Sequence, residues 1–191
     1  VPFVFELRDL WPASITAVGI MKENWILNFF VKLELFLYLQ ADLIISVTHS
    51  FKSELQNRGV SSDKIKVVLN GVDLERYYPL QEKDESLAVK YELKNKFVIG
   101  YVGTHGLAHA LENVIDAAEL ITKEDNIRIV LAGGGAERSR LEKKVRERGL
   151  KNIVMIPRQP KDQMPQVWSL CDISLVHLKD SPLFKPVIRP K

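Results

Sequence analysis

The sequence of 191 residues lacks several features that often define a function. Its single cysteine, Cys171, cannot form an internal disulfide, which is typical of proteins of a reducing compartment and predicts a cytoplasmic location. The 27 basic residues barely exceed the 24 acidic ones, which argues against a nucleic-acid-binding surface. His, Cys, Asp and Glu nowhere have the spacing of a metal site, so we expect no metal.

A hydrophobic run long enough to cross a membrane is also missing. The most apolar stretch, residues 24–40, is interrupted by Lys32 and Glu34, and it falls short of the roughly 20 residues that a membrane span needs. We expect a buried helix here. The alternative is a helix whose surplus apolar side chains dock on a membrane surface or on a partner.

Strands and helices alternate along the chain. Apolar runs that predict strands occupy residues 1–7, 42–47, 65–69, 97–102, 127–132, 152–156 and 172–177. Helical patterns separate them, so the sequence predicts an α/β protein with parallel sheets and right-handed crossovers. Residues 80–96 are highly charged and are interpreted as a linker between a first domain, 1–79, and a second domain, 97–191.

Glycines interrupt the second half of the chain where strands end. The strand at residues 97–102 leads through Gly103, Thr104, His105 and Gly106 into a helical pattern. Free backbone N–H groups at such a turn suit a phosphate or another anion, and an ordinary tight turn between strand and helix is the alternative. The spacing is not that of the G-x-G-x-x-G dinucleotide motif, and no Walker lysine follows.

Together, these segments resemble the family 4 retaining glycosyltransferases of the GT-B fold. The pieces that carry the resemblance are ADLIISVTHSFKSEL, KIKVVLNGVDLERYYP, FVIGYVGTHGLAHALENVIDAAELI, IRIVLAGGGAERSRLEKKV and NIVMIPRQPKDQMPQVWSLCDISLV. The most specific one is Asn70-Gly71-Val72-Asp73 with Tyr78-Pro79, which is similar to the family's N-G-V-D-x-x-x-F-x-P signature. RDLWP and GTHGLAHALENV look closest to the aminosugar-transferase-like branch that builds bacterial surface polysaccharides.

The resemblance implies two Rossmann-like domains, a nucleotide-diphosphate-sugar donor in the second and a saccharide or lipid-linked saccharide acceptor facing the first. It assigns the donor site to the glycine loops and to a segment beside the base: Gly103, Thr104, His105, Gly106, Gly133, Gly134, Gly135, Arg158 and Gln159. No cofactor is expected. Relatives place an Arg and a Lys on the diphosphate, where this chain offers His105 and His109.

On the acceptor side, Arg8 and Asp9 lie where many relatives carry His-Asp, so Asp9 fits the pattern and Arg8 departs from it. At the end of the next strand, His49 is a third candidate catalytic residue, and an ordinary histidine in a loop capped by Ser50 is the alternative. The family's pair of glutamates does not occur before Lys191. We therefore expect a fragment, inactive alone, in which neither domain completes its sheet.

The function expected from the resemblance is transfer of a sugar with retention, in polysaccharide biosynthesis, at the cytoplasmic face of the membrane. Two alternatives stay open: a non-catalytic α/β binding or scaffold protein, and a nucleotide-sugar epimerase of the same fold.

Overall fold

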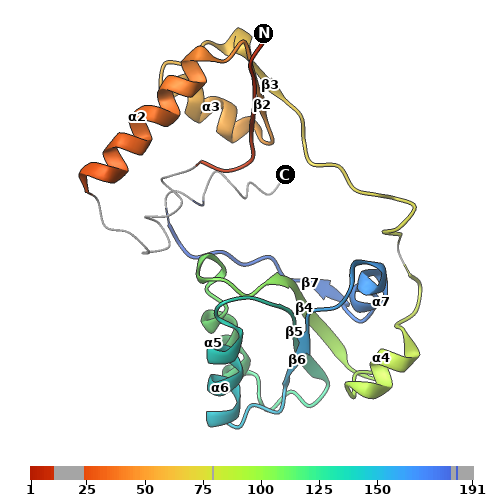
Figure 1. Cartoon of the computed structure of the whole chain (residues 1–191). Helices are drawn as coiled ribbons and strands as arrows, with labels where there is room; N and C mark the ends of the chain where they lie inside the picture. Colours follow the sequence, from red (N-terminus) through yellow and green to blue (C-terminus); the bar gives the residue numbers. More distant parts are fainter. Residues whose placement is uncertain (11–23, 79, 182–183, 185–191) are drawn as a thin grey trace. The chain divides into compact units, whose positions relative to one another are not determined.

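The computed structural model describes residues 1–10, 24–78, 80–181 and 184. The chain divides into two compact units, of which unit 1 is built on Val1–Gly71 and unit 2 comprises Val72–Lys179. Each has its own parallel sheet, drawn in Figure 1. The predicted strand–helix alternation and α/β class are confirmed.

Unit 1 has its strands in the order β1-β2-β3 within the described residues, namely Val4–Leu7, Leu43–Ser46 and Ile65–Val67. Helix α2 (Trp25–Gln40) connects β1 to β2, and α3 (His49–Asn57) connects β2 to β3 through the short turn η1 (Ser62–Lys64). Parallel strands in sequential order place both right-handed crossovers on the same face. An ion pair of 2.9 Å between Arg58 and Glu34 joins the end of α3 to α2.

The core of unit 1 is a single cluster between the sheet and these two helices. Its largest fully buried members include Tyr38, Phe51, Ile44 and Leu55. The expectation that α2 is a buried helix is only partly met. Leu27, Glu34 and Tyr38 are buried, whereas Trp25, Ile26, Phe29, Val31, Leu33, Phe36 and Leu39 are exposed. A helix that is apolar almost all round needs a cover on several sides, and the described residues cover one side.

Unit 2 has the strand order β6-β5-β4-β7 among its described residues. The strands are β4 (Phe97–Thr104), β5 (Ile127–Gly134), β6 (Ile153–Pro157) and β7 (Ile173–Ser174). The helices and turns are α4 (Glu85–Lys90), η2 (Leu107–His109), α5 (Glu112–Leu120), α6 (Arg138–Glu147), η3 (Lys161–Gln163) and α7 (Met164–Ser169). Because every pair is parallel, the strands bring their carboxyl ends to one edge of the sheet.

Hydrophobic clusters cover both faces of the unit 2 sheet. On one face, Ile115, Leu131 and Leu141 belong to the cluster under α5 and α6. On the other, Val98, Ile156 and Leu170 belong to the cluster under α4 and α7. This explains why the β4 and β5 strands are apolar without alternation, since both of their sides are buried.

Residues 80–96, predicted as a linker, pack into unit 2. Helix α4 buries Ala88, and Leu93 beyond it is fully buried in the same cluster. Ahead of α4, Lys83 pairs with Asp172 at 2.6 Å and donates to the Lys96 carbonyl. The boundary between the units lies at Gly71, so the charged stretch belongs to the second unit. The sequence did not reveal this, because the stretch is mostly charged and only a few apolar residues, such as Ala88 and Leu93, pack into the core.

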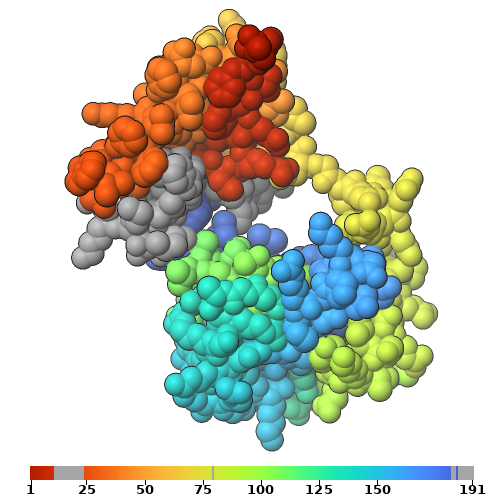
Figure 2. Space-filling model, viewed as in Figure 1, coloured from red at the N-terminus to blue at the C-terminus, as the bar shows by residue number. Residues whose placement is uncertain are grey.

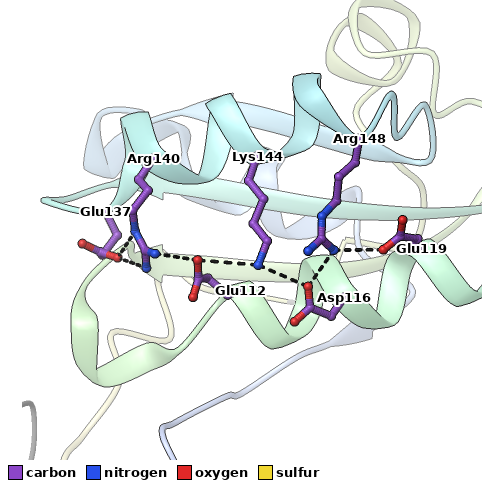
Figure 3. A network of polar contacts seen from close by, with 7 residues as sticks. All are labelled: Glu112, Asp116, Glu119, Glu137, Arg140, Lys144 and Arg148. Atoms are coloured by element: carbon purple, nitrogen blue, oxygen red, sulfur yellow. Dashed lines mark hydrogen bonds and ion pairs between the residues drawn. The ribbon is translucent and has the colours of Figure 1, made fainter.

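Ion pairs join α5 to α6 along their outer sides (Figure 3). Lys144 lies between Glu112 at 3.5 Å and Asp116 at 3.2 Å, and Arg148 contacts Asp116 at 2.7 Å. The further ion pairs involve Glu119, Glu137 and Arg140, and the whole set is called the ion-pair ladder below. Most basic side chains of α6 are therefore paired with carboxylates.

Candidate functional site

A cavity of about 610 Å³ opens at the carboxyl ends of β4, β5 and β6 in unit 2. Open α/β sheets bind their ligands at this position. Residues of the predicted donor site line it: Gly103, Thr104, Gly133, Gly134, Gly135, Arg158 and Gln159. The parallel sheet brings these three segments together, because the strands end side by side at Gly103, Gly133 and Pro157.

The glycines of the two loops differ in whether the surrounding structure leaves room for a side chain. A Cβ on Gly133 would lie 1.9 Å from the carbonyl oxygen of Gly103, and one on Gly135 would lie 2.4 Å from that of His105. Both residues also have positive φ, which a side chain disfavours. These two glycines are therefore required by the packing of one loop on the other.

Gly134 and Gly106 are different, because a Cβ there meets only ordinary contacts. The nearest atoms are the Arg158 Cβ at 3.7 Å and the His109 Nδ1 at 3.5 Å. The protein itself does not require a glycine at either position. Gly134 lines the cavity, so a ligand that approaches its backbone closely would account for the missing side chain.

His105 lies beneath the loop instead of in the cavity. The residue is fully buried, with its ring 6.1 Å from that of Tyr101. Its backbone N–H donates to Gly134 and its carbonyl accepts from Glu137, so it ties the two glycine loops together. Burial, with Arg138 nearby, lowers the pKa of His105 and keeps the ring neutral. Hence the expectation that its side chain offers charge to a diphosphate does not fit this position.

Cations reach the cavity from another segment. Arg158 and Lys161 both line it, both are exposed, and neither has an ion-pair partner among the described residues. Arg138 is not free in the same way: it donates to the Ile156 carbonyl at 2.9 Å and pairs with Glu142 at 2.7 Å. Lys161 was missed in the sequence, because nothing in the glycine pattern marks a lysine in the loop after β6.

The wall opposite the glycines is apolar. It is formed by Met164, Val167 and Trp168 of α7, with Pro160 ahead of it. Trp168 offers a flat aromatic surface to the cavity. Gln159 lines the same cavity, and its amide donates to the Pro157 carbonyl at 2.9 Å. Trp168 was not predicted either. A single aromatic residue in a short helix forms no pattern that would mark a binding site.

In unit 1, the candidate residues follow the strands of its sheet. Arg8 and Asp9 come directly after β1 and are exposed. The Arg8 guanidinium donates to the side-chain oxygen of Asn70 at 3.3 Å and pairs with Glu6. Asn70 opens the N-G-V-D signature, so the structure joins two motifs 62 residues apart. Trp11 and Pro12 of RDLWP, and Pro79 of the signature, lie outside the described residues.

His49 is the first residue of α3, directly beyond β2, and its side chain is exposed. The helix is capped by Thr48, whose hydroxyl accepts from Phe51 N–H at 3.0 Å. Thr48, and not His49, therefore caps the helix, and His49 is the residue that follows the cap. It lies at the same edge of the sheet as Arg8 and Asp9, although no contact between these side chains is seen in the described residues.

A second cavity, of about 290 Å³, lies between β1 and α2. Arg8 and Asp9 line it together with Phe30, Glu34 and Tyr38. Glu34 accepts from the Tyr38 hydroxyl at 2.5 Å and is held by Arg58. Burial raises the pKa of Glu34, and these partners oppose that shift. Both oxygens of the Glu34 carboxylate are thus hydrogen-bonded within the protein, to Tyr38 and to Arg58.

The described residues contain no group of three or more His, Cys, Asp or Glu side chains that could hold a metal ion. Among the helices in the described ranges, none is long and apolar enough to cross a membrane.

Comparison with known proteins places the chain in a family. The sequence model described as "Glycosyl transferases group 1" matches residues 82–180, and the one described as "Glycosyltransferase Family 4" matches residues 1–76. The chain belongs to the group 1 glycosyltransferases. The predicted resemblance to family 4 is thereby confirmed, and the boundary between the units at Gly71 falls close to the end of the first match.

Among curated proteins, the putative colanic acid biosynthesis glycosyl transferase WcaI of Escherichia coli K12 is 30% identical over 137 residues. The match covers 71% of this chain and 33% of WcaI. The probable glycosyltransferase WbjE of Pseudomonas aeruginosa is 21% identical over 179 residues, covering 93% of this chain and 44% of WbjE. The chain thus spans less than half the length of these two relatives.

Crystal structures of similar fold include HepE of Anabaena in complex with UDP and glucose, with a TM-score of 0.75 at 18% identity. The match covers 95% of this chain and 47% of HepE. WaaG, a glycosyltransferase involved in lipopolysaccharide biosynthesis, has a TM-score of 0.72 at 14% identity, covering 92% of this chain and 50% of WaaG. At such identities the likeness concerns the fold, and it supports the predicted GT-B class.

Proposed function

We propose that the chain carries the donor site and part of the acceptor side of a retaining, metal-independent glycosyltransferase. It transfers a sugar from a nucleoside-diphosphate sugar to a saccharide or lipid-linked saccharide. The observation that carries the proposal is the cavity at the ends of β4, β5 and β6, which is lined both by glycine backbone and by two cations that have no ion-pair partner among the described residues. The family membership and the UDP in the HepE structure support it.

In this proposal the cavity holds the nucleotide by two kinds of contact. The base lies in the part walled by Trp168, where an aromatic face provides stacking. The diphosphate approaches Gly134, whose missing side chain leaves room for it. As the bond between sugar and diphosphate breaks, negative charge develops on the leaving group. Arg158 and Lys161, free of other partners in the described residues, stabilise that charge.

The acceptor side is proposed at the carboxyl edge of the unit 1 sheet. Asp9 is exposed there without a partner among the described residues, so its carboxylate can accept a hydrogen bond from an acceptor hydroxyl. Arg8, anchored on Asn70, and His49 are the neighbouring polar groups that orient the acceptor.

The proposed class of acceptor suggests where in the cell the enzyme works. We place the enzyme in the cytoplasm, at the inner face of the cell membrane, where a lipid-linked acceptor presents its sugar. The names of WcaI, in colanic acid biosynthesis, and of WaaG, in lipopolysaccharide biosynthesis, support surface polysaccharide as the class of product.

The donor site is tested with Gly134→Ala and titration calorimetry with UDP. The substitution fits the protein, so the fold stays intact, whereas the added methyl group occupies the place of the phosphate. We expect UDP affinity to fall about tenfold or more, which corresponds to ~1.4 kcal/mol. Lys161→Met should weaken UDP by a similar factor through the lost charge.

Gly71→Ala is the matched control, because a Cβ there meets nothing within 4 Å and the residue lies in unit 1. It should leave UDP affinity unchanged. Unaltered affinity in a folded Gly134→Ala variant, or no UDP binding by the wild-type chain, would remove the basis for the donor site. Asp9→Asn should lower turnover in an active enzyme while UDP affinity is retained.

A further inference from the structure

Arg138, the first residue of α6, joins the carboxyl ends of β5 and β6 through its side chain. Its guanidinium donates to the carbonyl oxygen of Gly133 in β5, and to that of Ile156 in β6 at 2.9 Å. The same group pairs with Glu142, one turn further along α6, at 2.7 Å. The backbone N–H of Arg138 donates to the Gly135 carbonyl at 3.1 Å. One residue therefore connects the ends of two neighbouring strands to the start of a helix.

The residues that follow these two strand ends belong to the cavity. Gly133 and Pro157 form the last pair in the register of β5 with β6. Gly134 follows on one strand and Arg158 on the other, and both line the cavity. A Cβ built on Gly134 would lie 3.7 Å from the Cβ of Arg158. The glycine backbone and the guanidinium proposed to meet the diphosphate are therefore neighbours, directly beyond the carbonyls that Arg138 holds.

The segment that carries Arg158 has little regular structure of its own. Strand β6 ends at Pro157 and η3 begins at Lys161, and the three described residues between them are neither helix nor strand. The hydrogen bond of Gln159 to the Pro157 carbonyl stays within this segment. Figure 2 shows the segment and α7 as blue atoms at the surface of unit 2. The direction in which Arg158 leaves the sheet is therefore set at the end of β6.

We propose that Arg138 is a positioning residue of the donor site, which fixes the direction of Arg158 relative to the loop that contains Gly134. It acts through another group, because Arg138 is not among the residues that line the cavity. Its charge is matched by Glu142, so its contribution is the geometry of its hydrogen bonds. The planar guanidinium suits this task, since it presents several donors in fixed directions. The inference rests on the proposed function, which takes the cavity as the donor site.

Two other roles for Arg138 lead to different expectations. If its positive charge attracted the diphosphate, a lysine at this position would serve nearly as well. If it only stabilised unit 2, a variant that lost as much stability elsewhere in the unit would be impaired in the same way. The experiments below separate these roles from positioning.

The first experiment is titration calorimetry of the whole chain with UDP. Arg138→Met removes every donor and keeps an unbranched stem, and Arg138→Lys keeps the charge without the planar group. We expect both variants to bind UDP about tenfold more weakly than the wild-type chain. Each variant is measured equally far below its own melting temperature, with circular dichroism to verify the fold.

The matched control is Asn152→Ala, at the other end of the same strand. Asn152 is buried directly before β6, and its amide donates to the Ala118 carbonyl at 2.7 Å. Its loss should lower the melting temperature of unit 2, because a buried carbonyl loses its partner. UDP affinity should be unchanged, since Asn152 does not line the cavity.

A double variant shows whether Arg138 acts through Arg158. Arg158→Met alone should weaken UDP binding through the loss of a cation. Adding Arg138→Met to it should have little further effect, because the group that Arg138 positions is already gone. Effects of the two substitutions that multiply would mean that Arg138 acts independently of Arg158.

Amide hydrogen exchange provides a readout that needs no ligand. In Arg138→Met, the amides of residues 158–163 should exchange faster than in the wild-type chain, because the end of β6 is no longer held. In Asn152→Ala, the same amides should keep their wild-type rates. Unchanged exchange of this segment in Arg138→Met would overturn the positioning role.

The UDP titrations distinguish a failure of this inference from a failure of the proposed function. Wild-type affinity in a folded Arg138→Met variant, rescue by Arg138→Lys, or an equal loss in Asn152→Ala would overturn the positioning role and leave the donor site in place. An absence of UDP binding by the wild-type chain would overturn both.

Discussion

The two units differ in how many faces of the parallel sheet are covered by helices. In unit 2, α5 and α6 cover one face and α4 and α7 the other, so that both sides of β4 and β5 are buried. In unit 1, both crossovers lie on one face, and one cluster forms the core within the described residues. Its outward apolar surface is accordingly large, both on α2 and at Val4 of β1 and Val68 directly after β3.

The comparison shows that an apolar sequence does not by itself indicate whether other elements cover a helix. Helix α2 is far more apolar than α6, yet α6 packs onto a complete two-faced core and turns its charges outward. The cavity at the carboxyl ends of the unit 2 strands measures about 610 Å³, against about 290 Å³ for the one beside α2 in unit 1. Unit 1 offers mainly an edge of polar residues and an apolar helix face for other molecules.

The strongest test of this contrast is Gly133→Ala in unit 2. The new methyl group would overlap the Gly103 carbonyl, and the positive φ adds backbone strain. We expect unit 2 to lose about 4 kcal/mol of unfolding free energy or more. Thermal melting of the chain, followed by circular dichroism, should show this loss.

Unit 1 should melt as in the wild-type chain, because we propose that the two units fold on separate cores. Gly134→Ala is the neighbouring control and should cost little stability. A Gly133→Ala variant of wild-type stability would show that the two glycine loops do not pack as described.

The second test is the pH dependence of unit 2 stability, through His105. Burial lowers its pKa below the ordinary value of 6.5, with Arg138 and His109 acting in the same direction and Glu142 against them. As the pH falls below about 6.5, the unfolded chain takes up a proton that the folded chain refuses. Stability is therefore complete above this pH and declines below it, until the folded-state pKa is reached.

The slope from His105 is at most about 1.4 kcal/mol per pH unit. His109 is half-buried, which lowers its pKa as well, so it adds a contribution of the same sign. His105→Phe should therefore reduce the slope of unfolding free energy against pH between pH 5 and 6.5. The reduction should equal the contribution of roughly one titrating group, so that some slope remains. Urea unfolding at a series of pH values measures this. Equal slopes in variant and wild type would mean that the His105 ring reaches solvent.

The smallest effect is expected for the ion-pair ladder of unit 2. Lys144→Met removes the contacts with Glu112 and Asp116. Such exposed pairs contribute about 0.2–1 kcal/mol, and salt screens them. Urea unfolding at low and high salt should show a small loss that shrinks with salt. Lys151→Met, an exposed lysine without a partner among the described residues, is the control. A larger loss would mean that the ladder, and not the core, holds α5 on α6.

Much of the lining of the proposed donor cavity could be predicted from the sequence, because glycines stand at the ends of two apolar strands. The strands that end at Thr104 and Gly134 are local features, and parallel pairing then brings their ends together. The motifs of Arg8 and Asn70 were also recognised, although their contact was not. Trp168 and Lys161 escaped notice because a single aromatic or basic side chain has no pattern.

What the sequence determined by itself is the alternation of elements, the parallel sheets and the family, since periodicity and glycine positions are encoded locally. Only the tertiary structure decided which side chains face a ligand and which are buried. His105 has the same neighbours in sequence whether it points into the cavity or beneath the loop, and packing against Tyr101 places it beneath. Burial depends on residues distant in the chain: α2 stays half uncovered because the described residues of unit 1 pack against one of its sides.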